Sequence, residues 1–422
     1  MISIKTFGFL SKASKNARSS NLLLKTFNSN HMRSAFLTLK AFRDPDYSRP
    51  PPFDYLTKSY INETPFYDRG LKRFDENTKF IVVEGNIGVG KSVVAKKIAE
   101  EFDLKYFPEV NMDMKYITEH GYDLRDMDPY LPERMQSVDI KKFYANPYHK
   151  AMPRLQIEMY RYRYFQYIDA LNHVINSGQG VVLERSHFSD FVFAKTLHQF
   201  NYIRKEMLRY YLNMRDETAK KLYHPHLVVY LDAPVDVLME RIKKRNIPHE
   251  VNSKVLTKEY LESLDKHYKE YLDFAKVKSV VKTLDWSVPQ DLDLLMMDIE
   301  KIDFDRYKKN ESQLFEWRNL DQTTEGNMRK LRRTLTLDLR NLIFPLYKED
   351  YDVTELFFGP EEINEYLTLR EKVPGEKYLM GFDPEAGDKT LFKTEKRTYH
   401  WRNILKDFLR EEICAIDSSI PV

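Results

Sequence analysis

The sequence of 422 residues lacks most features that mark disulfide-rich, membrane-spanning or electron-transfer proteins. Its single cysteine, Cys414, excludes an internal disulfide framework and a metal cluster held by cysteines. No apolar run approaches the length that crosses a bilayer, so we expect a soluble or membrane-peripheral protein without a transmembrane segment. There is no dinucleotide-binding fingerprint and no motif for a quinone, a flavin or an iron–sulfur cluster. The chain is long enough for a large core and two domains.

Residues 1–43 contain no Asp or Glu but eight Lys or Arg residues, with serines and apolar residues between them. This composition predicts a mitochondrial transit peptide, and a basic tail that binds nucleic acid or anionic lipid is the alternative. Without these eight charges the formal net charge changes from +3 to −5. The body of the chain therefore carries no gross signal for a nucleic-acid partner.

Aromatic residues make up 14% of the chain, and Tyr outnumbers Phe. Tyrosine-rich composition is typical of protein-binding surfaces. It is equally typical of an aromatic core, and composition does not distinguish the two.

Strand-like and helix-like segments alternate over residues 79–290, which predicts a parallel α/β sheet. Before them, residues 44–78 form a lead-in rich in Pro, Tyr and Asp, either extended along a partner or an unstructured linker. After them, residues 291–422 form a charged, helical and irregular extension. The expected strands are 80–83, 104–107, 180–183, 227–231 and 279–283, and the expected long helices are 154–175, 235–244 and 258–274.

Residues 85–92, called the phosphate loop below, match the complete pattern Gly-x-x-x-x-Gly-Lys-Ser. The apolar run 80–83 precedes the loop and the amphipathic stretch 93–102 follows it, which is the strand–loop–helix context of a phosphate-binding loop. Backbone N–H groups would turn toward the phosphates, Lys91 would reach them and the Ser92 hydroxyl would ligate Mg²⁺. We therefore predict a site for ATP or a deoxynucleoside triphosphate, bound by Gly85, Asn86, Gly88, Gly90, Lys91 and Ser92.

Carboxylates and arginines follow two of the expected strands and one helix. Glu109 stands at the carboxyl edge of the sheet, where ligands bind, and suits a general base; a solvated loop glutamate is the alternative. Glu184 suits a Mg²⁺ shell and Arg185 suits phosphate oxygens, although a structural ion pair would have the same sequence. Arg241 and Arg245 share a helix face, as a phosphate lid would, or they complement the dipole of that helix.

These motifs resemble those of the deoxyribonucleoside kinase family, whose members are similar in fold to thymidylate kinases. The resemblance implies a P-loop α/β fold in which Glu109 is the base, and Arg185 and the lid arginines serve phosphate transfer. It also implies that Tyr144 contacts the sugar and Gln156 the base of a nucleoside. It spans about residues 79–290 and rests on segments 85–92, 107–110, 143–147, 155–156, 184–186 and 241–245.

The sequence departs from the kinase pattern at positions that matter for turnover. Val110 follows Glu109 where kinases commonly have Pro, and Met114 stands near the position of an expected Trp. Phe191 replaces a second arginine, and Pro248 lies in a lid where active members have a third arginine and acidic residues. Fewer cations near the transferred phosphoryl group mean weaker stabilisation of the transition state.

The sequence is also similar to the nucleoside-kinase-like accessory subunits of mitochondrial NADH:ubiquinone oxidoreductase (complex I). This likeness continues beyond the kinase-like region, with matching segments at 180–186, 189–193, 202–205, 248–250, 374–378 and 387–389. It implies a non-catalytic subunit, peripheral to the inner membrane on the matrix side of the membrane arm and in contact with other complex I subunits. A bound FAD is implied by the resemblance alone.

Two alternatives to an accessory subunit stay open. One is an active mitochondrial deoxyribonucleoside kinase, which would transfer the γ-phosphate of ATP to a nucleoside 5′-hydroxyl with Glu109 and Arg185 as catalytic residues. The other is a free nucleotide-sensing protein. The appended residues 291–422 favour an assembly role, because a kinase has no use for them.

Overall fold

Five parallel strands form the central sheet, in the order β2-β3-β1-β4-β5. The strands are β1 (Phe80–Gly85), β2 (Lys105–Phe107), β3 (Val181–Glu184), β4 (Leu227–Asp232) and β5 (Val280–Asp285). The computed structural model describes residues 36–44, 48–55, 70–118, 121–305, 311–321, 328, 331–332, 334–335 and 353–373. The predicted α/β fold with a P-loop is confirmed, and each predicted strand overlaps an observed one.

Strand β1 is buried along its whole length, because a parallel sheet carries helices on both faces and therefore selects continuous apolar runs. Val83 is in register with Glu184 of β3 on one side and with Val229 of β4 on the other. The carboxyl ends of these strands consequently lie at one edge of the sheet. The loops that follow β1, β2 and β3 start from this edge, where parallel α/β proteins bind ligands.

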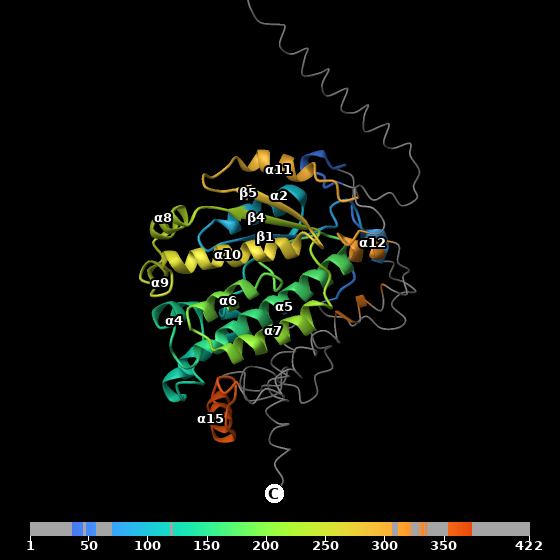
Figure 1. Cartoon of the computed structure of the whole chain (residues 1–422). Helices are drawn as coiled ribbons and strands as arrows, with labels where there is room; N and C mark the ends of the chain where they lie inside the picture. Colours follow the sequence, from blue (N-terminus) through green and yellow to red (C-terminus); the bar gives the residue numbers. More distant parts are fainter. Residues whose placement is uncertain are drawn as a thin grey trace, which may run out of the picture. The chain divides into compact units, whose positions relative to one another are not determined.

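Helices cover both faces of the sheet (Figure 1). Helices α2 (Lys91–Phe102) and α11 (Leu292–Glu300) lie on one face, and α5 (Met152–Ser177) and α10 (Lys258–Ala275) lie on the other. Nearly every residue of α5 is buried, because further helices pack against the side that faces away from the sheet. The remaining helices are η1 (Lys40–Phe42), η3 (Gly70–Arg73), α3 (Asp113–Tyr116), η4 (Leu124–Tyr130), α4 (Ile140–Ala145), α6 (Phe191–Gln199), α7 (Lys205–Ala219), α8 (Val235–Arg245), α9 (Pro248–Val251), α12 (Phe315–Asp321) and α15 (Pro360–Arg370).

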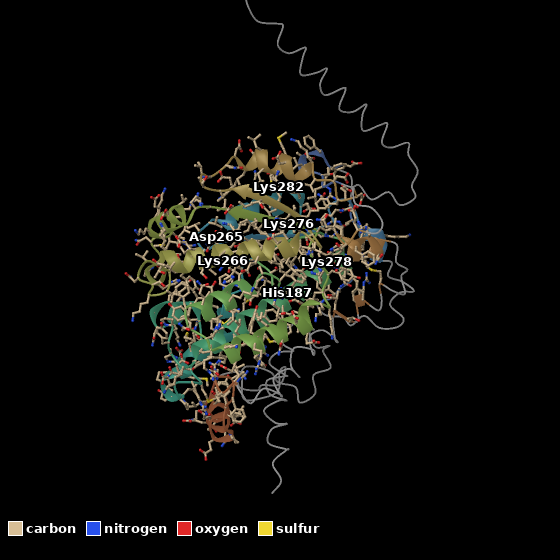
Figure 2. All side chains as sticks on the ribbon, viewed as in Figure 1. His187, Asp265, Lys266, Lys276, Lys278 and Lys282 are labelled. Atoms are coloured by element: carbon tan, nitrogen blue, oxygen red, sulfur yellow. The ribbon has the colours of Figure 1, made fainter. Side chains whose placement is uncertain are left out.

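The abundant tyrosines belong largely to the core. His187 lies in the helical layer beneath the sheet (Figure 2), and the rings of Tyr160, Tyr164 and Tyr167 lie edge-on to it. Burial holds the pKa of His187 well below its usual range, so the imidazole is neutral at physiological pH. Among the residues that the structure describes, most tyrosines are therefore part of an aromatic core, and a few, such as Tyr130 and Tyr148, are exposed.

The described part of the lead-in packs against this chain. Leu37 is buried in the core, Thr38 accepts a hydrogen bond from Asn77, and Arg43 and Arg49 both pair with Asp75. Residues 36–43, which the sequence assigns to the transit peptide, therefore contribute to the folded unit.

Residues 353–373, which we call the C-terminal strap, bind three separate places on the kinase-like region. Glu355 pairs with Arg204 at 2.6 Å, Glu362 pairs with Arg134, and the guanidinium of Arg154 lies over the ring of Phe358. Leu369, Tyr366 and Val373 form a small apolar cluster with Met127 and Leu131. Part of the appended extension is thus bound within the molecule.

Two sequence predictions fall outside the described residues. One is most of the expected transit peptide, residues 1–35, and the other is the C-terminal likeness to the complex I subunits at 374–378 and 387–389. Among the described helices, none combines the length and the apolar character needed to cross a membrane.

Candidate functional site

The phosphate loop joins the end of β1 to the start of α2, as its sequence predicts. Gly88 and Gly90 have φ angles of 79° and 99°, a left-handed region that residues with a Cβ rarely adopt. Gly90 is also the N-cap of α2, so the N–H groups of the first helical turn face the end of the loop. This arrangement provides partial positive charge for a phosphate.

Lys91 lines the cavity beside the loop and is only 6% exposed. Its ammonium donates to the carbonyl of Asn86 at 3.0 Å. Burial, and then the nearby Arg185, lower its pKa to about 7, although Glu109, Glu184 and Glu84 act in the opposite direction. A phosphate beside Lys91 would supply the negative charge that the buried ammonium needs.

Asn86 and Gly85 support the loop from behind and do not line the cavity. The amide of Asn86 donates to the carbonyl of Leu261 on α10 at 2.9 Å. The carbonyl of Gly85 accepts from Arg185 at 3.1 Å. Of the six loop residues predicted to bind phosphate, Gly88, Gly90, Lys91 and Ser92 line the cavity.

Glu109 and Arg185 meet at the edge of the sheet, and Arg163 of α5 joins them. The Arg185 guanidinium donates to the Glu109 carboxylate, and Arg163 lies 3.4 Å from the same oxygen. Burial alone would raise the pKa of Glu109, but Arg185, Lys91 and Arg163 outweigh it and lower the pKa to about 2. A carboxylate held this firmly by cations accepts a proton weakly.

The backbone of Arg185 adopts an uncommon conformation, with φ 62° in the left-handed region. Its other nitrogens are bound as well, because Nε donates to the Tyr268 hydroxyl at 3.1 Å and Nη2 donates to the Gly85 carbonyl. Such strain persists only where surrounding bonds fix the residue. Arg185 is thus a fixed positive charge in the wall of the cavity.

Glu184 and Ser92 come together at the same edge. The Ser92 hydroxyl donates to Glu184 Oε2 at 2.6 Å, and the Tyr106 hydroxyl of β2 donates to Oε1. Ser92 and Glu184 are the residues that the sequence assigns to Mg²⁺. The contact with Tyr106 was not expected.

The two lid arginines point to different partners. Arg241 donates to the carbonyls of Trp286 and Ser287 at 2.8 and 3.1 Å and approaches that of Val89. It is absent from the cavity lining, which differs from the expected phosphate lid. Arg245 does line the cavity, where it pairs with Glu250 of α9.

Beyond the phosphates, the cavity extends toward α4 and α5 with a volume of about 360 Å³. Tyr144 lines this end, and the His249 ring of α9 stacks on it with 6.2 Å between ring centroids. Gln156 also lines it, but its amide donates at 2.6 Å to Asp190, a carboxylate that also binds Arg163. Tyr144 and Gln156 therefore line the end of the cavity beyond the phosphate loop, the end to which the kinase resemblance assigns the nucleoside.

The sequence pattern missed three site residues that the structure brings to this edge: Glu84, Tyr106 and Arg163. The one signal for Glu84 in the sequence is that it is an acidic residue in the otherwise apolar run of β1. It is fully buried, Ser186 donates to it at 3.2 Å, and no described residue donates to its second oxygen. Burial raises the pKa of Glu84 to about 7, although nearby serines and arginines act against this shift.

The sheet order, the phosphate loop and the acidic and basic residues at its edge define a P-loop kinase-like class. Residues 81–319 match the deoxynucleoside kinase family, and the chain belongs to this family.

Within that class the chain is similar both to a respiratory subunit and to kinases. NADH dehydrogenase (ubiquinone) 1 alpha subcomplex subunit 10, mitochondrial, of Bos taurus is 32% identical over 332 residues, which cover 77% of this chain and 90% of the relative. Deoxyguanosine kinase of Dictyostelium discoideum is 28% identical over 228 residues, covering 54% and 70%. A solved structure of deoxyadenosine kinase from M. mycoides with bound dATP has a TM-score of 0.40 at 20% identity, covering 52% of this chain and 98% of the other.

Proposed function

We propose that this protein is an accessory, non-catalytic subunit of mitochondrial NADH:ubiquinone oxidoreductase (complex I). The observation that carries the proposal is the extent of the likeness to the bovine subunit. It covers 332 residues, whereas the likeness to the deoxyguanosine kinase covers 228. A shared kinase domain alone would not account for the longer match.

The geometry of the site supports the absence of turnover. Glu109, the carboxylate to which the kinase resemblance assigns the role of general base, is bound by Arg185 and Arg163 and has a low pKa. Arg241 binds backbone carbonyls instead of facing the cavity. Cations stabilise the charge that develops during phosphoryl transfer, and here Arg185 and Arg163 bind Glu109 while Arg241 binds backbone carbonyls.

We further propose that the cavity holds a nucleotide, ATP or a deoxynucleoside triphosphate, as a structural ligand. Gly88, Gly90, Lys91 and Ser92 would bind its phosphates, with Arg245 at the lid, and Tyr144 and Gln156 would face the nucleoside. A volume of about 360 Å³ is at the lower end of small-molecule sites, which suits one nucleotide. FAD carries a second nucleotide half and a tricyclic ring, so it fits this cavity poorly.

Ser92 and Glu184 supply the hydroxyl and the carboxylate that Mg²⁺ uses in P-loop sites, although the Tyr106 hydroxyl shares the same carboxylate. Their oxygens already lie 2.6 Å apart. The ion would neutralise phosphate charge. The described residues contain no larger group of His, Cys, Asp and Glu that would hold a metal elsewhere.

The remaining assignments belong to the same proposal. The N-terminal residues act as a transit peptide, with the boundary moved from residue 43 toward residue 36, because Leu37 is buried in the folded unit. Residues 44–78 remain a lead-in, 79–290 the kinase-like domain and 291–422 an extension for assembly contacts. The subunit is peripheral, on the matrix side of the inner membrane, and binds other complex I subunits.

Native electrophoresis of solubilised mitochondria, with this protein detected by antibody, tests the assembly role. We expect comigration with complex I and loss of assembled complex when the protein is depleted. A protein that migrates alone at about its own mass, with complex I unchanged on depletion, would contradict the proposal and favour a free nucleotide sensor.

An active deoxyribonucleoside kinase is the second candidate, because the phosphate loop is complete and Glu109 faces the cavity. Purified protein is assayed with Mg-ATP and each deoxynucleoside. Turnover near typical enzyme rates, of the order of 1 per second or more, that Glu109→Gln abolishes without unfolding would establish this alternative. We expect no turnover above the Glu109→Gln control.

A further inference from the structure

Both carboxylate oxygens of Glu184 are occupied by hydroxyl donors. Ser92 Oγ donates to Oε2 at 2.6 Å, and the hydroxyl of Tyr106 donates to Oε1. The bond to Ser92 does not compete with an ion, because an ion bound between the two residues would replace it. The bond to Tyr106 comes from a third element, β2, and the same hydroxyl also interacts with Ser92, so it lies on the side of Glu184 where an ion would bind.

The position of Tyr106 is set by the sheet. Tyr106 is the middle residue of β2 and is in register with Val182 of β3, two residues before Glu184. The pairing of β2 with β3 fixes the backbone of Tyr106, so only a rotation of its side chain could withdraw the hydroxyl from Glu184. A tyrosine hydroxyl is protonated at neutral pH and therefore acts as a donor to the carboxylate.

A hydroxyl donor on Glu184 works against a divalent cation. Mg²⁺ demands near-octahedral oxygen ligands and gives up its water reluctantly, so it needs carboxylate oxygens that are free to accept it or its waters. The ammonium of Lys96, 5.8 Å from the ring centroid of Tyr106, adds positive charge on this side. Meanwhile Lys91 and Arg245 line the cavity and can neutralise phosphates without a metal.

We propose that Tyr106 determines the cation requirement of the site: by capping Glu184 it allows the cavity to hold a nucleotide with little help from Mg²⁺. The inference rests on the nucleotide-binding part of the proposed function. In this inference Tyr106 makes the cavity favour a nucleotide without Mg²⁺ over a Mg²⁺–nucleotide complex, whereas the loop binds the phosphates in both cases.

The test compares the full chain with its Tyr106→Phe variant. ATP and dATP are titrated by calorimetry, each with excess Mg²⁺ and with EDTA. The matched control is Tyr230→Phe, because Tyr230 is also a strand tyrosine whose hydroxyl donates to a carboxylate, Asp265, away from the cavity. Binding of Mn²⁺ in the presence of nucleotide, followed by electron paramagnetic resonance, reads the metal directly.

For the unmodified chain and for Tyr230→Phe, we expect Kd to change less than about threefold between Mg²⁺ and EDTA. For Tyr106→Phe, we expect roughly tenfold tighter binding with Mg²⁺ than with EDTA, together with a new Mn²⁺ signal. A tenfold dependence on Mg²⁺ in the unmodified chain would overturn the inference and leave nucleotide binding intact. So would a Tyr106→Phe variant that behaves like the control. No binding of ATP or dATP under any condition would overturn the nucleotide site itself.

Discussion

The phosphate loop presents Lys91 to the cavity, whereas the lid turns Arg241 away and pairs Arg245 with Glu250. In the proposed function the loop binds phosphate through backbone N–H groups and one ammonium, and these would act on any bound nucleotide. The lid of a kinase acts chiefly on charge that develops during transfer. Binding a nucleotide and transferring its phosphate are therefore separable properties. In this chain the residues suited to binding are in place, whereas the lid residues suited to transfer bind other partners.

The largest effect we expect concerns the buried carboxyl behind the loop. Glu84 has a pKa of about 7 in the folded protein against 4.5 in the unfolded chain. Because the unfolded chain loses this proton first, the stability contributed by Glu84 falls as pH rises from 4.5 to 7 and stays low above. Glu84→Gln should therefore raise the free energy of unfolding by about 3 kcal/mol at pH 8 and hardly at all near pH 4.5. Thermal melting at both pH values measures this difference, and an equal shift at the two would contradict it.

Removing the loop cation should weaken nucleotide binding more than any lid change. Lys91→Ala deletes a charged donor to phosphate, so we expect Kd for ATP to rise about 10- to 100-fold. The stabilisation of the melting temperature by nucleotide should shrink accordingly. Equal melting temperatures with and without nucleotide, in both proteins, would indicate a loop that no longer binds.

The same lysine should make binding depend on pH. Its pKa of about 7 in the free protein would rise beside a phosphate, so binding takes up a proton above pH 7. Affinity should be highest below pH 7 and fall by at most about tenfold per pH unit above it. Titrations from pH 6 to 9 measure this trend, and Lys91→Ala serves as the control for the titration of the nucleotide itself. An unchanged slope in that variant would exclude Lys91 as the cause.

The smallest effects should separate the two lid arginines. Arg241→Ala removes hydrogen bonds to the Trp286 and Ser287 carbonyls and should lower stability by about 2 kcal/mol while leaving nucleotide affinity within about threefold. Arg245→Ala removes an exposed ion pair and should change stability by less than about 1 kcal/mol. Chemical denaturation measures the free energy of unfolding of both variants, and titration measures their Kd for nucleotide. Equal changes in the two variants would contradict this assignment.

Much of the architecture could be predicted from local patterns. Strands such as β1 and β4 are short apolar runs buried on both faces, and such runs are visible in the sequence. The motif of the phosphate loop predicts the turn between β1 and α2. The positions of Glu109 and Glu184 followed from one rule, that parallel strands end at the same edge.

Other contacts join residues whose relation no local pattern contains. Arg163 reaches Glu109 from the middle of a helix that looks uniformly buried, and Tyr106 reaches Glu184 across a strand pair. Helical spacing placed Arg241 and Arg245 on one face, but it did not indicate that the loop after β5 would bind only the first. Such partners depend on which segments the fold brings together, and this is a property of the whole chain.

The C-terminal strap also bears on how the protein is made. Its ion pairs join residues 228 and 151 positions apart, Arg134 with Glu362 and Arg204 with Glu355. Contacts of such long sequence separation carry a large loop-closure entropy and form late in folding. We therefore expect the strap to dock after the sheet has formed, and its partly exposed ion pairs and small apolar cluster should let it open before the core does. Amide exchange should report residues 353–373 as a separate unit that exchanges long before β1 and β4.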